Sequence, residues 1–310
     1  MTIIQLEYII AVDTHRHFGK AADSCFVTQP TLSMQIQKLE DQLGVILFDR
    51  SKQPVVPTEI GKRIIKQARV VVNEARRISE MVVEEKGEVS GELNIGIIPT
   101  LSPYLAPLFI QRYVDKFPGV KVRIHELITE ELVSRLKSDS LDVGILVTPY
   151  SDSGLKEFPL FHEEFVAYLS HRNPLFEREV ISAADLKDAT MWLLNEGHCF
   201  REQVLNICKD YRERDSRLKY ESGSLEALKK MVDMHGGVTL LPQLATLDLH
   251  TSEKQKIRPF ADPKPMREVS LVMHKSFLKK NMVESLREEI LASIPDYINI
   301  KKDASIVKWK

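Results

Sequence analysis

The sequence predicts an α/β protein whose N-terminal part is entirely helical apart from a small wing. Residues 1–58 begin with an amphipathic helical pattern around Leu6 to Asp13. Two short helical patterns separated by a tight turn follow, and then two short strand-like stretches. A long helical pattern covers residues 59–88. From residue 92 onward strand-like and helix-like segments alternate, which is typical of mostly parallel sheets. A chain of 310 residues with this organisation is expected to form two or three domains.

The composition is that of a soluble globular protein. Hydrophobic residues make up 43% of the sequence and charged residues 28%. No apolar run approaches the roughly 18 residues that a membrane span requires, and the first residues lack the pattern of a signal peptide. We therefore expect a cytoplasmic protein with no membrane partner. The net charge of -1 gives no indication of a nucleic-acid partner, so any DNA-binding site has to rest on motif geometry.

The first motif is the pair of short helices near the N-terminus. Thr28 is placed to cap the second helix and Gly44 to end it. The stretch from Val45 to Pro57 predicts a two-stranded wing. Two short helices joined by a tight turn are typical of a helix-turn-helix, whose second helix offers polar side chains to the major groove of DNA. Spacing alone fits an ordinary helical hairpin in an enzyme equally well.

The long helix over 59–88 carries a single apolar stripe. Its members recur at steps of four and three: Ile60, Ile64, Ala68, Val71, Ala75, Ile78 and Val82. A stripe of this length beside a small domain favours pairing with a second copy of the chain. The alternative is that the stripe packs onto its own chain.

Two of the three cysteines form the second motif. Gly197 ends an apolar run, and the helical spacing beyond it places Cys199 near a helix start, where unpaired backbone N–H groups favour the thiolate. His198 and Arg201 are expected to add positive charge. Cys208 lies among apolar residues, where a thiol is usually inert. Three cysteines are too few for a structural disulfide framework.

The spacing of this cysteine pair constrains what it can do. On an intact helix a nine-residue step gives a rise of about 13.5 Å and places the side chains on opposite faces. A disulfide requires Cα atoms within about 7 Å, so a Cys199–Cys208 bond would require the helix to unwind or move. Two unrelated cysteines remain an alternative of equal weight. Zinc is disfavoured because Cys-x-x-Cys pairs are missing, and neither a metal nor a cofactor is expected.

The order of these parts resembles that of the LysR-type transcriptional regulators. The stretch AADSCFVTQPTLSMQIQKLEDQLGVILFDR is similar to the DNA-binding signature of that family, and GGVTLLP is typical of its second lobe. The stretches HRHFGKAADSC, IPTLSPYL, GHCFREQ with Cys208, and GSLEALKKMV resemble the members of the family that sense hydrogen peroxide. The resemblance covers essentially the whole chain.

The resemblance implies a division into three parts. Residues 1–58 would form a winged helix-turn-helix DNA-binding domain and 59–88 a linker helix for dimerisation. Residues 91–310 would form a redox-sensing regulatory domain like a periplasmic binding protein, with two lobes of mostly parallel sheets. Lobe I would comprise about 91–161 and 267–300, and lobe II about 162–266. The basic tail after Ile298 indicates no function.

The resemblance also implies roles for individual residues. Cys199 would be the peroxidatic cysteine and Cys208 the resolving cysteine. The residues expected to line the peroxide pocket are Thr100, Thr129, His198, Arg201 and Glu202. The residues expected near DNA are Thr28, Gln29, Pro30, Thr31, Ser33, Gln37, Lys38 and Arg50. For the two threonines of the pocket, plain helix capping is an equally good account.

The leading hypothesis is a peroxide-responsive regulator of transcription, an activator in oxidative stress that is not an enzyme. Its partners would be double-stranded DNA, further copies of itself in a homodimer or homotetramer, hydrogen peroxide as the signal, and RNA polymerase. The second hypothesis is a LysR-type regulator of a small metabolite with incidental cysteines. The third is a peroxide-consuming thiol enzyme, which would leave the helix-turn-helix unexplained.

Overall fold

The computed structural model divides the chain into two compact units, Met1–Gly87 and Glu88–Lys310. The residues that the structure describes are 1–85, 89–150, 152–209, 211, 220–275, 277, 279–298 and 305–308. Within these ranges no helix is both long enough and apolar enough to cross a membrane.

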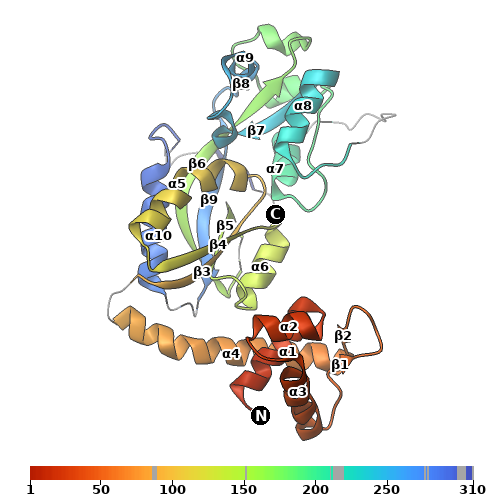
Figure 1. Ribbon diagram of the computed structural model, residues 1–310. Coiled ribbons are helices and arrows are strands. Elements are labelled where there is room, and N and C mark those ends of the chain that lie inside the picture. The colour runs from red at the N-terminus through yellow and green to blue at the C-terminus, as the bar shows by residue number, and fades with distance from the viewer. Residues whose placement is uncertain are drawn as a thin grey trace. The chain divides into compact units, whose positions relative to one another are not determined.

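The first unit contains three short helices, a small wing and one long helix (Figure 1). Its elements are α1 (Ile3–His15), α2 (Phe18–Ser24), α3 (Gln29–Leu43), β1 (Phe48–Asp49), β2 (Val56–Pro57) and α4 (Glu59–Glu85). As predicted, the Thr28 hydroxyl accepts a hydrogen bond from the Thr31 amide at the start of α3, and Gly44 ends this helix with a left-handed φ of 69°. β1 and β2 pair antiparallel and form the predicted wing.

The long helix α4 divides its apolar side chains between its own unit and the surface. Ile65, Ala68 and Val72 are buried in one cluster with residues of α1 and α3. Val71 and Ile78 of the predicted stripe are 38% and 69% exposed. The side chain of Val82 lies outside the described part. Helix α4 therefore packs partly onto its own unit and leaves part of the predicted apolar stripe exposed.

The second unit is an α/β structure around a continuous sheet. Its strands follow the order β4-β3-β5-β9-β6-β7, with β10 added to β9 and β8 added to β6. The strands are β3 (Gly91–Ile97), β4 (Val120–Glu126), β5 (Val143–Thr148), β6 (Leu155–Leu169), β7 (Val238–Pro242), β8 (Ile257–Pro259), β9 (Pro265–His274) and β10 (Ser305–Ile306). The helices are α5 (Ser102–Lys116), α6 (Thr129–Lys137), α7 (Cys199–Ile207), α8 (Leu225–His235), α9 (Thr251–Lys254) and α10 (Lys280–Ser293). Short 3₁₀ turns cover Pro174–Glu177, Ala183–Leu186 and Gln243–Thr246.

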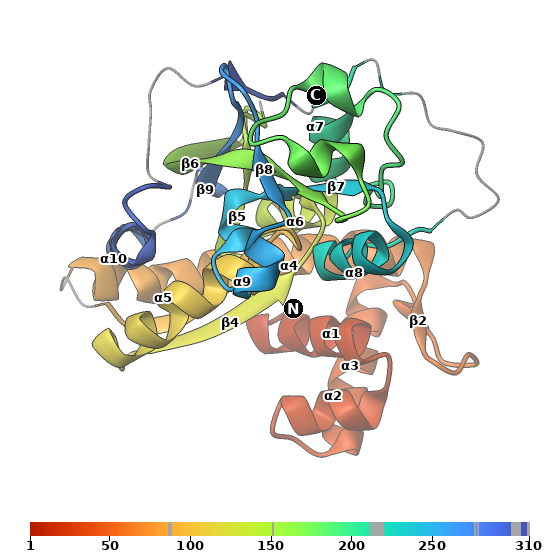
Figure 2. The same ribbon diagram turned by 90° about the horizontal axis from the view of Figure 1, so that it is seen from above.

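The sheet is mixed, which corrects the expectation of mostly parallel sheets. β3 pairs parallel with β4 and β5, whereas β9 pairs antiparallel with β5 and with β6. The long strands β6 and β9 lie side by side, and β6 extends beyond β9 to pair antiparallel with β7 and β8 (Figure 1 and Figure 2). Alternation along the sequence could not show that these two strands run in opposite directions. The apolar run over 191–195, expected from the sequence as a further strand before Gly197, contributes a single isolated bridge in the described structure, between Met191 and Val238.

Two hydrophobic clusters give this unit two lobes. One cluster lies around β3 and β5 with α5, α6 and α10, and the other lies around β7 with α7 and α8. Gly96 and Gly144 allow α6 to approach the sheet, because a Cβ at either position would lie within 3.0 Å of a leucine side chain. α5 and α10 lie beside each other, and the hydroxyl of Tyr113 donates to the carbonyl of Met282 at 3.2 Å (Figure 1). β6 and β9 connect the two lobes.

Candidate functional site

The cysteine motif occupies α7. Gly197 has a φ of 90°, a conformation that favours glycine, and the chain turns there into the helix. Cys199 is the first residue of α7, as the helical spacing predicted, and Cys208 follows the last residue as the C-cap. The two cysteines therefore lie at opposite ends of one helix of 9 residues.

Both cysteines are free thiols that are almost fully buried. Cys199 is 4% exposed and Cys208 is 3% exposed. Cys199 belongs to the cluster around β3 and β5, whereas Cys208 belongs to the cluster around β7. One helix thus places a thiol in the core of each lobe. Burial raises the pKa of the Cys208 thiol to about 12, so in this conformation it is protonated at neutral pH.

The surroundings of Cys199 act on its thiol in two opposing directions. Burial raises the pKa of Cys199, and this effect prevails. A hydrogen bond from the Thr129 hydroxyl, the charge of Arg267 and the backbone N–H of Phe200 each lower it. The helix start favours the thiolate of Cys199, as expected, but its effect does not lower the pKa of the thiol overall in this conformation. Desolvation outweighs the helix terminus, although groups that favour the thiolate are in place.

Arg267 is the buried cation of the site, and sequence analysis did not identify it. Its side chain is fully buried, and its Nε donates to Glu163 at 2.8 Å. Nη1 donates to the hydroxyl of Thr100 at 2.9 Å, and Nη2 donates to the Thr100 carbonyl at 3.1 Å. The guanidinium also makes a cation–π contact with Phe200, at 5.3 Å from the centre of the ring. Arg267 thus connects β9 with Thr100 and with the first turn of α7.

Glu163 fixes this arginine from the neighbouring strand. It is fully buried, and its second oxygen accepts from the backbone N–H of Leu244 at 3.0 Å. A buried charge requires a partner, and the ion pair at 2.7 Å supplies one to each residue. The only sequence signal for this ion pair is that the charged residues Glu163 and Arg267 each lie close to an apolar strand pattern. Such a residue is common at strand ends, so the pair could not be singled out.

The capping alternative for the two threonines does not account for their positions. Leu101 is the N-cap of α5 and Ile128 is the N-cap of α6, and neither helix has a side-chain cap. Thr100 precedes the cap residue, and its hydroxyl accepts from Arg267. Thr129 is the first residue of α6, and its hydroxyl bonds to Cys199. Both hydroxyls are therefore directed at the cysteine and arginine network.

The other three predicted pocket residues occupy different surroundings. His198 is the N-cap of α7 and is 8% exposed, and burial lowers its pKa, so its imidazole is neutral at neutral pH. The expectation that His198 adds positive charge is therefore wrong, because desolvation keeps its imidazole neutral. Arg201 donates from Nη1 to the carbonyl of Leu194 at 2.9 Å. Glu202 is exposed. Arg267, and not His198 or Arg201, supplies the cation that acts on Cys199.

The predicted DNA-contacting residues gather at the start of α3 and on its outer face. Thr28, Gln29 and Pro30 are exposed, and the hydroxyls of Thr28 and Thr31 lie 2.9 Å apart. Further along the helix Lys38 is exposed. An exposed helix start with polar side chains is the geometry by which a recognition helix enters a major groove.

Arg50 in the wing is linked to this helix. It donates from Nη1 to the Ser33 hydroxyl at 3.2 Å and from Nη2 to Glu40 at 2.9 Å, and its guanidinium lies 5.0 Å from the Phe18 ring centre. The Gln37 amide, by contrast, donates to Asp41 at 3.0 Å. Glu40 also accepts from the Leu47 backbone N–H at 2.7 Å, so one buried carboxylate positions both the wing and its arginine.

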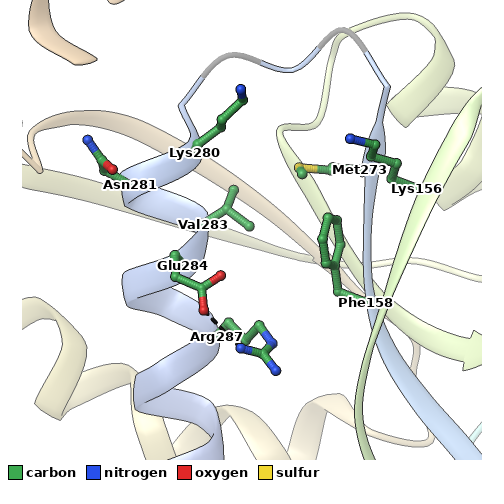
Figure 3. Close-up of a pocket in the computed structure, with 8 residues that line it drawn as sticks. All are labelled: Lys156, Phe158, Met273, Lys280, Asn281, Val283, Glu284 and Arg287. Carbon is green, nitrogen blue, oxygen red and sulfur yellow. Dashed lines mark hydrogen bonds and ion pairs between the residues drawn. The ribbon is translucent and has the colours of Figure 1, made fainter. Parts of the chain in front are cut away.

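A separate hollow of about 370 Å³ lies between α10 and the strands β6 and β9. Figure 3 shows Lys156 and Phe158 of β6 and Met273 of β9 facing the side chains of α10. Arg287 forms an ion pair with Glu284 at 2.8 Å. None of the residues predicted for the peroxide pocket lines this hollow. Among the described residues no group of three or more His, Cys, Asp or Glu could hold a metal ion.

Comparison with known proteins identifies the family. Residues 3–62 match the family described as "Bacterial regulatory helix-turn-helix protein, lysR family", and residues 86–294 match the "LysR substrate binding domain". The chain belongs to the LysR family of transcriptional regulators, which bind DNA and are not enzymes.

Individual relatives cover nearly the whole chain. The chain is 37% identical over 299 residues to the DNA-binding transcriptional dual regulator OxyR of Escherichia coli, covering 96% of this chain and 98% of the relative. It is 35% identical over 290 residues to the hydrogen peroxide-inducible genes activator of Haemophilus influenzae, covering 94% and 96%.

Solved structures of OxyR proteins share this fold. Full-length OxyR from Pseudomonas aeruginosa with a cysteine-to-aspartate substitution matches with a TM-score of 0.79 at 35% identity, covering 95% of this chain and 99% of that one. A cysteine mutant of OxyR from Corynebacterium glutamicum, with hydrogen peroxide bound, matches with a TM-score of 0.62 at 26% identity, covering 94% and 92%. The chain therefore has the architecture of an OxyR-like LysR regulator.

Proposed function

We propose that this LysR-family regulator responds to hydrogen peroxide through oxidation of Cys199 and a subsequent disulfide with Cys208. The observation that carries the proposal is the buried thiol of Cys199 at a helix start, beside the Thr129 hydroxyl and the Arg267 cation. Two similar proteins support it by name, one as a hydrogen peroxide-inducible genes activator and one as a structure with hydrogen peroxide bound. Peroxide is small and uncharged, so it suits a desolvated site.

The first step is oxidation of Cys199 by two electrons. The thiolate sulfur attacks one peroxide oxygen, an S–O bond forms, the O–O bond breaks, and hydroxide leaves and is protonated to water. Arg267 supplies a positive charge that favours both the thiolate and the departing hydroxide. The Thr129 hydroxyl donates to the sulfur. The Thr100 hydroxyl accepts from Arg267, and its own hydrogen is then free to be donated to a peroxide oxygen.

The second step joins the two cysteines. The Cys208 thiolate attacks the sulfenic sulfur of Cys199, an S–S bond forms, the S–O bond breaks, and hydroxide leaves as a second water after protonation. Two thiols and one peroxide thereby give one disulfide and two waters. Cys208 must leave its apolar surroundings to form the thiolate, since burial raises its pKa to about 12.

The same disulfide requires α7 to change shape. An intact α7 separates Cys199 from Cys208 by about 13.5 Å along the helix axis, whereas a disulfide requires their Cα atoms to lie within about 7 Å. Cys199 and Cys208 also belong to the cores of different lobes. Unwinding α7 would therefore disturb both cores, which provides a route from peroxide chemistry to a rearrangement of the regulatory unit.

The partners follow from the first unit. The start of α3 would enter a major groove and Arg50 of the wing would contact a phosphate of double-stranded DNA. The exposed apolar residues of α4, including Ile78 at 69% exposed, would pair with a second copy, and two such dimers would form a tetramer.

RNA polymerase would be the partner that receives the signal. The protein would act in the cytoplasm.

The experiment is DNA footprinting of the full chain on a promoter that it binds, before and after treatment with hydrogen peroxide. We expect the intact chain to change its footprint, and Cys199→Ser to bind as the reduced protein does but to ignore peroxide. Cys25→Ser is the matched control, because Cys25 lies in the first unit and is expected to leave the response intact. A Cys199→Ser variant that still switches with peroxide contradicts the proposal.

A further inference from the structure

The C-terminal segment 305–308 is bound to the regulatory unit as an added strand. β10 pairs parallel with the beginning of β9, with Ser305 opposite Pro265 and Ile306 opposite Met266. The backbone N–H of Val307 donates to the Met266 carbonyl at 2.8 Å. Met266 immediately precedes the buried cation Arg267, so the segment is attached directly beside the candidate site.

The same segment is also bound by the side chains of α7. The Gln203 amide donates to the Val307 carbonyl at 2.9 Å, and the Asn206 amide donates to the Lys308 carbonyl at 2.8 Å. Gln203 is fully buried. Because Cys199, Gln203 and Asn206 follow at steps of four and three, they share one face of the helix.

Packing adds to these hydrogen bonds. The Val307 side chain is half-buried against the cluster around β7, which contains Phe200, Val204 and Cys208. The segment thus joins a fixed strand, β9, to the one helix that separates the two cysteines. The side-chain amides of Gln203 and Asn206 on the helix donate to backbone carbonyls of the segment. The contact therefore depends on the positions that these two residues have while α7 is helical.

We propose that the strand 305–308 is an intramolecular clamp that holds α7 in its helical form and thereby sets how readily the Cys199–Cys208 disulfide forms. This inference rests on the cysteine switch proposed above. Gln203 and Asn206 lie between the two cysteines, so any unwinding that brings the sulfurs together displaces both amides from their carbonyls. The clamp therefore opposes the second chemical step and leaves the attack of Cys199 on peroxide unaffected.

The first experiment compares the full chain with a chain that ends at Ala304 and lacks the strand. A chain that ends at Lys308 is the matched control, since it retains the strand. Disulfide formation after peroxide is followed by acid quenching and mass spectrometry, and sulfenic acid formation is followed separately in a Cys208→Ser background. We expect removal of the strand to accelerate disulfide formation roughly tenfold, the effect of a few lost hydrogen bonds on the helical state, and to leave sulfenic acid formation unchanged. Equal or slower disulfide formation in the shortened chain overturns the clamp.

A second measurement separates failure of the clamp from failure of the switch. Hydrogen exchange of the α7 amides in the fully reduced chain reports the stability of the helix without any cysteine chemistry. The chain ending at Ala304 is expected to exchange these amides faster than the chain ending at Lys308. Absence of a disulfide in every version would refute the switch alone, whereas unchanged exchange would refute the clamp.

A point substitution covers the case in which the shortened chain fails to fold. Asn206 is exposed, so Asn206→Asp is expected to fold, and it replaces a donor with an acceptor that faces the Lys308 carbonyl. Asn206→Gln is the control at the same position, because it keeps a side-chain amide that can donate to the Lys308 carbonyl. We expect faster α7 exchange and faster disulfide formation in Asn206→Asp only. Identical behaviour of the two variants contradicts the clamp.

Discussion

Removal of the hydroxyl of Thr129 should slow the reaction of Cys199 with peroxide. Thr129→Val keeps the shape of the side chain but removes the hydrogen bond that stabilises the thiolate. A hydrogen bond to a charged group contributes about 1.5–3 kcal/mol, and the site is buried, so water does not replace the lost donor. Since the bond lowers the pKa of Cys199, its loss raises that pKa further and reduces the thiolate population at neutral pH.

The expected result is a decrease of about 10- to 150-fold in the rate of sulfenic acid formation, which is that free energy expressed as a rate ratio. The assay is stopped-flow mixing with hydrogen peroxide in a Cys208→Ser background, so that only the first step is observed. Thr129→Ser retains the hydroxyl and should react at close to the original rate. If Thr129→Val reacts as fast as Thr129→Ser, the assignment of Thr129 as a thiolate donor is wrong.

Three further predictions follow from the same network and from the first unit. Because burial raises the pKa of Cys199, its rate of reaction with peroxide should keep increasing from neutral pH to above about 8.5, the usual pKa of a thiol. A pH–rate profile checks this, and a rate that is already constant below about pH 7 would exclude a protonated resting thiol. Arg267→Met should lower stability by about 3–5 kcal/mol in urea unfolding, because it leaves the buried carboxylate of Glu163 without a cation. Adding Glu163→Gln should restore stability but not peroxide reactivity. Recovery of reactivity in that double variant would show that Arg267 is only structural. Gly61→Ala should destabilise the first unit by about 1–3 kcal/mol in calorimetry of the full chain, since its Cβ would lie 2.1 Å from the Leu47 carbonyl oxygen, and an unchanged transition would contradict that packing.

Local features of the fold could be predicted because they depend on residues close together in the sequence. The start of α3 follows from Thr28 and its end from Gly44, each of which acts within one helical turn. The position of Cys199 at the start of α7 follows in the same way from the glycine two residues earlier and the apolar spacing after it. These predictions are confirmed by the structure.

Features that depend on distant parts of the chain could not be predicted. Glu163 and Arg267 are 104 residues apart, and only the antiparallel pairing of β6 with β9 brings them together. The raised pKa of Cys199 has the same origin, since desolvation depends on how completely the lobes enclose the thiol. The attachment of 305–308 to α7 rests mainly on backbone carbonyls, which carry no sequence signal.

Peptide mapping of the cysteines shows whether Cys199 and Cys208 form a reversible, peroxide-dependent disulfide. The reduced full chain is treated briefly with about one equivalent of hydrogen peroxide, its remaining thiols are alkylated, and the cysteine peptides are identified by mass spectrometry. We expect a Cys199–Cys208 bond that dithiothreitol reverses, with Cys25 still free. Free thiols at both positions, with Cys199 reacting no faster than Cys25, would contradict it.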